Sequence, residues 1–337
     1  MFFKQLHRLI KCIISRISEK IRIQSKYMLN KKTILLGTFI ILTLLTCKEK
    51  TIPQIRMAGI PWPGYEPLYT AASLGYFDSN IRMLEFPSAS EILRAFKNSN
   101  LEIAALTLDE VIYLSSEGFN GKIVLVLDVS NGADVLLAQK NITSASQLKG
   151  KKIGVEYTAL GAYILARFLE INHIKLKEIT MVPIEVDSHE ELFLAHKVDA
   201  VITFEPTKSR LLQKGANTIF SSSMIKGEIV DVLFVREDIY QQYPDTISHI
   251  KNGWYKSLDF MNKNFSVAAL KMKPRLNLSE EELKNVFKDI PLGDKIMNQQ
   301  LLETTPPPLL QTLKKVNSVM LENKIIKNKI YPENLFK

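Results

Sequence analysis

Two short stretches decide the fold of this chain: GADVLLA at residues 132–138 and IVDVLFV at residues 229–235. Each sets one aspartate, Asp134 or Asp231, ahead of an apolar run that is typical of a buried strand. Their similarity, and the α/β unit between them, predict two crossover strands that join two lobes. The chain then leaves the first lobe at residues 134–138 and returns at residues 229–235. The alternative is a pair of unrelated buried strands.

Strand-like and helix-like segments alternate on both sides of these stretches. Short apolar runs predict strands, and amphipathic stretches opened by capping pairs such as Ser88 with Glu91 predict helices. This alternation predicts an α/β fold with two lobes and with helices on the faces of each sheet. The expected strands cover residues 55–60, 81–86, 103–107 and 122–129 in the first series, and 152–156, 180–186, 198–204 and 217–220 in the second.

The predicted lobes are discontinuous in sequence. Lobe 1 is expected at residues 55–133 and 236–337, and lobe 2 at residues 139–228. After Arg236 the chain becomes more polar, with apolar residues at helical spacing, so the C-terminal part of lobe 1 is expected to be mostly helical.

The N-terminal segment has the pattern of an export signal. An apolar, uncharged run at residues 34–46 follows two lysines and ends at Cys47. Such a run before a cysteine is typical of a bacterial lipoprotein signal, and it is shorter than the about 20 residues of a spanning helix. We predict that residues 1–46 are removed, that Cys47 carries a lipid, and that residues 47–54 form a linker. The protein is then expected in the periplasm or on the cell surface, anchored to a membrane.

Two alternatives to this interpretation stay open. Thr46 stands where such signals usually carry Gly, Ala or Ser, so an uncleaved N-terminal membrane anchor is one alternative. Residues 1–27 make the signal unusually long, and Met28 begins an ordinary signal pattern. We therefore expect translation to start at Met28, with an extended basic leader as the alternative.

Charge and cysteine content narrow the functional class. The formal charge of +9 comes from 44 basic and 35 acidic residues, but nine bases and one acid lie within residues 1–47. The rest is close to neutral, which argues against nucleic acid as a partner. The two cysteines are Cys12 and Cys47, so the mature domain is expected to have neither a disulfide nor a thiolate metal cluster.

Several short motifs, in order and at matching spacing, resemble one family over residues 55–254. They are WPGYEPLY (62–69), LGYF (74–77), SASE (88–91), DVSNGAD (128–134), LKGKKIGV (148–155), VDAV (198–201) and FEP (204–206). The chain is similar to solute-binding proteins of bacterial ABC importers, in the nitrate/sulfonate/bicarbonate-type group that includes binders of the thiamine pyrimidine precursor. The resemblance implies a bilobal periplasmic-binding-protein fold (type II). It also implies an interlobe ligand cleft and, as partner, a permease with its ATPase.

Candidate ligand-binding residues follow the predicted strands, because ligands of open α/β sheets sit at the carboxyl ends of strands. Each residue also has a structural alternative, such as a helix cap, a hinge contact or a core aromatic. The candidates are Trp62, Gly64, Tyr65, Glu66, Thr107, Asp109, Ser130, Asn131, Asp134, Tyr157, Thr158, Gly161 and Glu205.

These positions offer acids and aromatic rings but few cations. Aromatic faces with carboxylates favour a nitrogen heterocycle or an amine, such as a thiamine pyrimidine precursor, as the small-molecule ligand. The alternative is an oxyanion such as a sulfonate, taurine or nitrate, which more naturally binds guanidinium or amide donors.

Two other functional classes compete with import. A pyrimidine-forming enzyme on the same fold would need a reactive His and Cys array, whereas His189 and His196 stand seven residues apart without a third ligand. An extracytoplasmic sensor could use the same two lobes. We expect a binding protein rather than an enzyme, with no cofactor, no metal and no catalytic residue.

Overall fold

The computed structural model describes residue 11 and residues 14–28, 53–156 and 159–336. Residues 14–28 form a helix in a separate N-terminal unit, and the second unit begins at Gln54. Cys47 lies outside the described residues, so its lipidation stays a prediction. In the part of the chain that the structure describes, no helix is both long and apolar enough to cross a membrane.

The second unit contains two five-stranded sheets of the same topology. The first has the order β2-β1-β3-β10-β4 and the second the order β7-β6-β8-β5-β9. In each sheet four strands run in the same direction, and one strand, β10 in the first sheet and β5 in the second, runs antiparallel between two of them. The first sheet contains β1 (Ile55–Gly59), β2 (Ile81–Glu85), β3 (Ile103–Thr107), β4 (Gly121–Val129) and β10 (Val230–Arg236). The second contains β5 (Asp134–Ala138), β6 (Lys152–Val155), β7 (Thr180–Pro183), β8 (Ala200–Phe204) and β9 (Asn217–Ser221).

The two decisive sequence stretches form one strand in each sheet. GADVLLA supplies β5 of the second sheet, and IVDVLFV supplies most of β10 of the first. The chain therefore passes between the sheets just before β5, at residues 130–133, and just before β10, at residues 222–229. The bilobal α/β fold is confirmed, while the predicted lobe boundaries stay a prediction.

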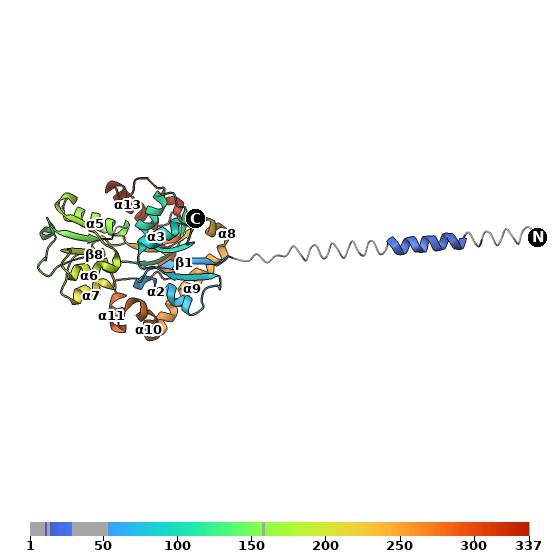
Figure 1. The fold of residues 1–337 in the computed structure, drawn as a ribbon, viewed down its shortest axis with the longest axis horizontal. Helices are drawn as coiled ribbons and strands as arrows, with labels where there is room; N and C mark the ends of the chain where they lie inside the picture. Colours follow the sequence, from blue (N-terminus) through green and yellow to red (C-terminus); the bar gives the residue numbers. More distant parts are fainter. Residues whose placement is uncertain (1–10, 12–13, 29–52, 157–158, 337) are drawn as a thin grey trace, which may run out of the picture. The chain divides into compact units, whose positions relative to one another are not determined.

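Helices cover the faces of both sheets, as the alternating pattern predicts. Figure 1 shows α5, α6 and α7 grouped with the second sheet, and α2 and α9, which pack against each other, with the first. The helices of the two α/β series are α2 (Glu66–Ser73), α3 (Ala89–Lys97), α4 (Leu108–Ser116), α5 (Ala159–Ile171), α6 (His189–Leu194) and α7 (Thr207–Gln213). The C-terminal helices are α8 (Glu237–Gln242), α9 (Pro244–Lys263), α10 (Phe265–Leu276), α11 (Glu280–Val286), α12 (Lys295–Leu302) and α13 (Leu309–Glu322).

Local sequence signals explain where these helices begin. The side chain of Ser88 accepts a hydrogen bond from the amide of Glu91 at the start of α3, and Ser279 forms a full capping box with Glu282 at α11. Such caps satisfy amide groups that the first turn of a helix leaves without partners. Every residue of β3 and β5 is buried, because helices cover both faces of each sheet.

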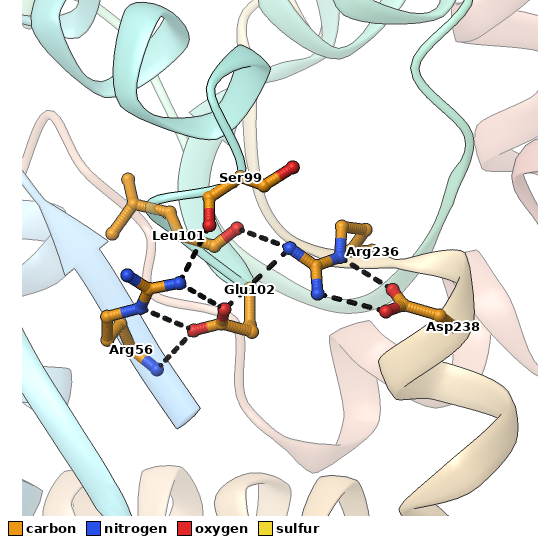
Figure 2. Close-up of polar contacts among 6 residues, drawn as sticks. All are labelled: Arg56, Ser99, Leu101, Glu102, Arg236 and Asp238. Carbon is orange, nitrogen blue, oxygen red and sulfur yellow. Dashed lines mark hydrogen bonds and ion pairs between the residues drawn. The ribbon is translucent and has the colours of Figure 1, made fainter. Parts of the chain in front are cut away.

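An ion network closes the first sheet at the amino-terminal edge of its parallel strands (Figure 2). The guanidinium of Arg56 on β1 donates to both carboxylate oxygens of Glu102, at 2.9 and 2.5 Å. Arg236, at the end of β10, lies 3.7 Å from Glu102 and donates to both oxygens of Asp238. Although burial opposes it, the hydrogen bond from Arg56 lowers the pKa of Glu102. Three segments of the sheet are thus joined by paired charges.

A second network joins the lobes beside the returning connection. The buried carboxylate of Glu228 accepts hydrogen bonds from the hydroxyl of Tyr163 at 2.6 Å and from Nε of Arg167 at 2.8 Å, both on α5. Nζ of Lys315, on α13, lies 2.7 Å from the same carboxylate. Glu228 therefore connects helices that belong to different lobes.

Candidate functional site

A small cavity lies where the carboxyl ends of the parallel strands of both sheets face each other. Eight of the lining side chains belong to the first sheet and the segments around it, and four belong to the second sheet and α5. The lining residues are Ile60, Trp62, Tyr65, Ala89, Ala105, Thr107, Glu110 and Asp231 from the first lobe, and Asp134, Glu156, Leu160 and Phe204 from the second. The volume is about 20 Å³, little more than the about 10–15 Å³ that one water needs. The lobes are therefore closed over this space, and a larger ligand requires them to part.

Four carboxyl groups line this space, which we call the acidic cavity. Glu110, Asp134, Glu156 and Asp231 are each less than 5% exposed, and none of the described lining residues is a lysine or an arginine. An ionised carboxylate that is removed from water without a cation is costly, so such groups either hold their protons or meet a positive partner. The cavity is therefore suited to a ligand that brings positive charge or N–H donors.

Trp62 and Gly64 form one unit beside the acidic cavity. Nε1 of Trp62 donates a hydrogen bond to Oδ2 of Asp128 at 3.0 Å. A β-carbon at Gly64 would lie 1.9 Å from that same oxygen and 2.4 Å from the indole nitrogen, so only glycine leaves room for this bond. The Trp62 ring also meets the ring of Phe204 edge-on, with centroids 5.8 Å apart, across the two lobes.

Asp231 and Asp128 form a carboxyl pair on neighbouring strands. The two residues are in register between β10 and β4, and both are buried. The hydroxyl of Tyr65 donates to Oδ1 of Asp231 at 2.5 Å. Burial, followed by the charge of Asp128, raises the pKa of Asp231 well above its ordinary range, and burial raises the pKa of Asp128 to about 7. Both carboxyl groups of the pair therefore hold their protons more tightly than exposed aspartates do.

Two further carboxyl groups of the acidic cavity belong to Asp134, at the start of β5, and to Glu110, on α4. Burial raises the pKa of Asp134 to about 7, and burial with the charge of Asp109 raises the pKa of Glu110 well above its usual range. Among the described residues, Oδ2 of Asp134 has no hydrogen-bond partner. A buried acceptor left without a donor is costly, so this oxygen is a place where a ligand N–H group would be stabilised.

The other predicted residues that the structure describes take structural positions around the cavity rather than lining it. Glu66 forms a two-point ion pair with Arg275, at 2.8 and 2.6 Å. Glu205 accepts from the amide and hydroxyl of Ser209 and lies 3.3 Å from Nζ of Lys208.

The crossover and helix-start candidates also hold the fold. The hydroxyl of Ser130 accepts from the amide of Asp134, Asn131 is exposed, and Asp109 is buried next to Glu110. A β-carbon at Gly161 would lie 2.5 Å from the carbonyl oxygen of Glu156, so this glycine lets α5 approach β6 closely. Tyr157 and Thr158 lie outside the described residues.

Of the predicted set, Trp62, Tyr65, Thr107 and Asp134 line the acidic cavity. The predicted set does not include the other three lining acids, Glu110, Glu156 and Asp231. Glu110 is the last residue of a Thr-x-x-Glu capping pattern that begins at Thr107, and its carboxylate accepts from the Thr107 amide at 3.0 Å. The signal was therefore visible, but it indicates a helix cap and says nothing of the cavity.

The chain matches known proteins in sequence and in structure. The taurine-binding periplasmic protein of Escherichia coli (strain K12) is 20% identical over 166 residues, 48% of this chain and 52% of that protein. The alignment thus spans about half the length of this curated relative.

Solved structures share the fold over most of the chain. The alkanesulfonate-binding protein SsuA from Xanthomonas axonopodis pv. citri, bound to MOPS, has a TM-score of 0.72 at 12% identity and covers 85% of this chain and 98% of its own. The ligand-binding component of an ABC-type import system from Staphylococcus aureus, with zinc bound, has a TM-score of 0.70 at 13% identity and covers 85% and 97%. These likenesses confirm the bilobal periplasmic-binding-protein fold.

The sequence family agrees with this fold. The NMT1-like family matches residues 48–270, which is more than half of the chain and includes both crossovers. The predicted resemblance to the nitrate/sulfonate/bicarbonate-type group is confirmed. The chain belongs to the NMT1-like family.

Proposed function

We propose that this protein is the solute-binding component of an ABC importer. It captures a small organic molecule between its lobes, outside the cytoplasm, and delivers it to a permease with its ATPase. The family match and the fold shared with the binding component of an import system support this role. A lipid on Cys47 would hold the protein near its permease. The proposal assigns no catalytic residue and no cofactor.

The lining of the acidic cavity supports the proposed class of ligand. Its described lining offers four carboxyl groups, two aromatic rings from the first lobe and no cation. The free oxygen of Asp134 adds an acceptor that no described residue satisfies. A planar nitrogen heterocycle or an amine supplies both the positive charge and the donors, and a thiamine pyrimidine precursor is a ligand of this kind.

A taurine-like or sulfonate ligand is the second candidate. It is favoured by the curated relative named as taurine-binding and by the solved alkanesulfonate-binding protein. A sulfonate group placed beside Glu110, Asp134 and Asp231 would oppose the ionisation of these carboxyl groups, whereas the ammonium group of taurine would favour it. We therefore place the nitrogen of either ligand in the acidic cavity.

Isothermal titration calorimetry with an aminopyrimidine, taurine, an alkanesulfonate and nitrate tests this assignment. We expect the nitrogen-bearing ligands to bind at micromolar concentration or below, about −8 kcal/mol. Asp134→Asn should weaken their binding at least about tenfold, about 1.4 kcal/mol. The matched control Asp259→Asn, at an exposed site, should leave binding unchanged. Binding of nitrate or the alkanesulfonate without binding of any amine would reverse the assignment.

Import and sensing are separated by the neighbouring genes. A permease gene and an ATPase gene beside this one favour import, and a sensor kinase gene favours signalling. A ligand present at 100 times its Kd should also stabilise the protein by about 2.7 kcal/mol in a thermal-shift assay. No shift across a broad panel of metabolites would contradict both binding roles.

A further inference from the structure

A second, larger cavity lies beside the acidic one, between α3 and α5. Its volume is about 460 Å³, within the about 300–1,000 Å³ of small-molecule sites. One side comes from α3, α4 and the segment that follows α13, and the other from α5 and β7. We call it the α3–α5 cavity. Like the acidic cavity, it lies between the two lobes.

Two helices supply its walls with the same spacing. The lining residues recur at i, i+3, i+4 and i+7, so each helix turns one face to the cavity. They are Ser90, Leu93, Arg94 and Lys97 on α3, and Ala162, Leu165, Ala166 and Leu169 on α5. Both helices begin at the acidic cavity, which Ala89 and Leu160 line. At about 1.5 Å per residue, the walls extend about 12 Å outward from it.

The middle of the α3–α5 cavity is apolar. The face of α5 contributes only alanine and leucine, and Leu93 stands opposite on α3. Leu176 and Met181 complete the wall, although 59% of Leu176 and 40% of Met181 is exposed. Covering this surface with an apolar ligand body would be favourable, at about 25 cal/mol per Å².

The outer part of the α3–α5 cavity is positively charged. Arg94, Lys97 and Lys324 line it, and the single acid among its described lining residues is Glu156. Arg94 lies 3.6 Å from Glu91, and both side chains are largely exposed, so this pair is weak. Lys97 lies over the ring of Tyr113, 5.3 Å from its centre. These contacts leave the basic side chains able to meet an anionic group.

Glu156 lines both cavities, so the two spaces are neighbours at the end of β6. One space is acidic, and the other is apolar with a basic rim. We propose that they form one bipartite site for a long, bipolar ligand. Its nitrogen-bearing group lies among the carboxyl groups, its apolar body lies between α3 and α5, and its anionic group lies at Arg94, Lys97 and Lys324. This inference rests on the proposed function and adds the shape and the second charge of the ligand.

Calorimetry with ω-amino carboxylic acids of increasing length, from ω-aminobutanoic to ω-aminododecanoic acid, tests the proposal. Alkylamines of the same lengths serve as matched ligands without the anionic group. We expect affinity for the amino acids to pass through a maximum with length. At that length it should exceed the affinity for the matched amine about tenfold, which is about 1.4 kcal/mol.

Variants then locate the two halves of the site. The double variant Arg94→Gln/Lys97→Gln should remove the tenfold excess and leave amine binding unchanged. The control Lys214→Gln/Lys226→Gln removes two exposed charges outside both cavities and should retain the excess. Ala162→Leu narrows the α3–α5 cavity and should move the maximum to shorter chains.

The outcomes distinguish the bipolar ligand from the proposed binding of amines in the acidic cavity. Amine binding that does not depend on length, or an excess that survives in Arg94→Gln/Lys97→Gln, overturns the bipolar ligand and leaves the acidic cavity as the amine site. Failure of every amine, long or short, overturns the proposed ligand class and the bipolar ligand together.

Discussion

Buried acids of opposite character lie at the two ends of strand β10: Glu102 beside Arg236, and Asp231 on the strand itself. At the outer end, Arg236 and Arg56 surround Glu102, and the hydrogen bond from Arg56 lowers its pKa against the effect of burial (Figure 2). At the cleft end, Asp231 faces Asp128 and Tyr65, and burial raises its pKa well above the ordinary range. The same strand of the same sheet thus has one end with paired charges and one end without.

The difference helps to tell buried acids that stabilise the fold from buried acids that belong to a ligand site. The outer end shows that the sheet can supply cations to a buried acid when that acid holds strands together. At the cleft end the described lining residues supply none, and the cost of burial is left for protons or a ligand to relieve. A buried acid without a cation is therefore the better indicator of a ligand site in this fold.

The largest effect on stability is expected from removing the charge of Glu102 at the outer end of β10. Glu102→Gln removes the negative charge that Arg56 and Arg236 share, so we expect a loss of about 3 kcal/mol in the free energy of unfolding. Urea denaturation at pH 7 measures it, with the exposed Glu117→Gln as control. A change below about 0.5 kcal/mol would mean that the network contributes no more than a surface pair.

The opposite sign is expected at the cleft end. Asp231→Asn keeps the shape of the side chain and still accepts from Tyr65, but it removes an acid that is costly to ionise. We expect the unliganded protein to gain about 1–2 kcal/mol at pH 8, and amine ligands to bind more weakly. Denaturation and calorimetry on the same variant measure both effects. A destabilised variant would show that the carboxyl pair is structural.

The pH dependence of stability should differ for the two ends. The pKa values of Asp109, Asp128 and Asp134 are raised to about 7, from about 3.9 in the unfolded chain, so the folded protein holds more protons between those values. The unfolding free energy should therefore fall as pH rises through this window, by up to about 1.4 kcal/mol per pH unit for each extra proton.

The pKa of Glu102 is lowered, so its contribution is instead lost as pH falls below about 4.5. Denaturation curves from pH 4 to pH 8 test the contrast, and Asp134→Asn should reduce the slope above pH 5. A stability that rises steadily from pH 5 to pH 8 would contradict the raised pKa values in the acidic cavity.

The fold was predictable because its signals are local and repeated. Short apolar runs, capping pairs and the two similar aspartate-containing stretches indicate both sheets and both crossovers, and the strands appear close to the expected ranges. The crossover strands differ from the prediction in one respect. Each belongs fully to one sheet, and the connections lie just before them, since strand patterns do not show where a ladder of hydrogen bonds changes partner.

The site was only partly predictable. Of the strand-end candidates, Trp62, Tyr65, Thr107 and Asp134 line the acidic cavity, and their part in ligand binding stays a prediction. Glu66 and Glu205 follow the same rule, yet Glu66 pairs with Arg275, a residue 209 positions away, and Glu205 turns to its own helix. Such distant pairings depend on tertiary packing, and single-sequence patterns cannot show which acid meets a cation.

Glu228 and Ser90 each take part in a contact between the two lobes. The buried carboxylate of Glu228 has two donors on α5, in its own lobe, and one on α13, so parting the lobes breaks only its contact with Lys315. At the open edge, the hydroxyl of Ser90 reaches Glu185 through one exposed hydrogen bond of 3.2 Å. Breaking that bond costs about 1 kcal/mol. Parting the lobes at these two points therefore breaks one contact at each, and the charge of Glu228 keeps its two partners on α5.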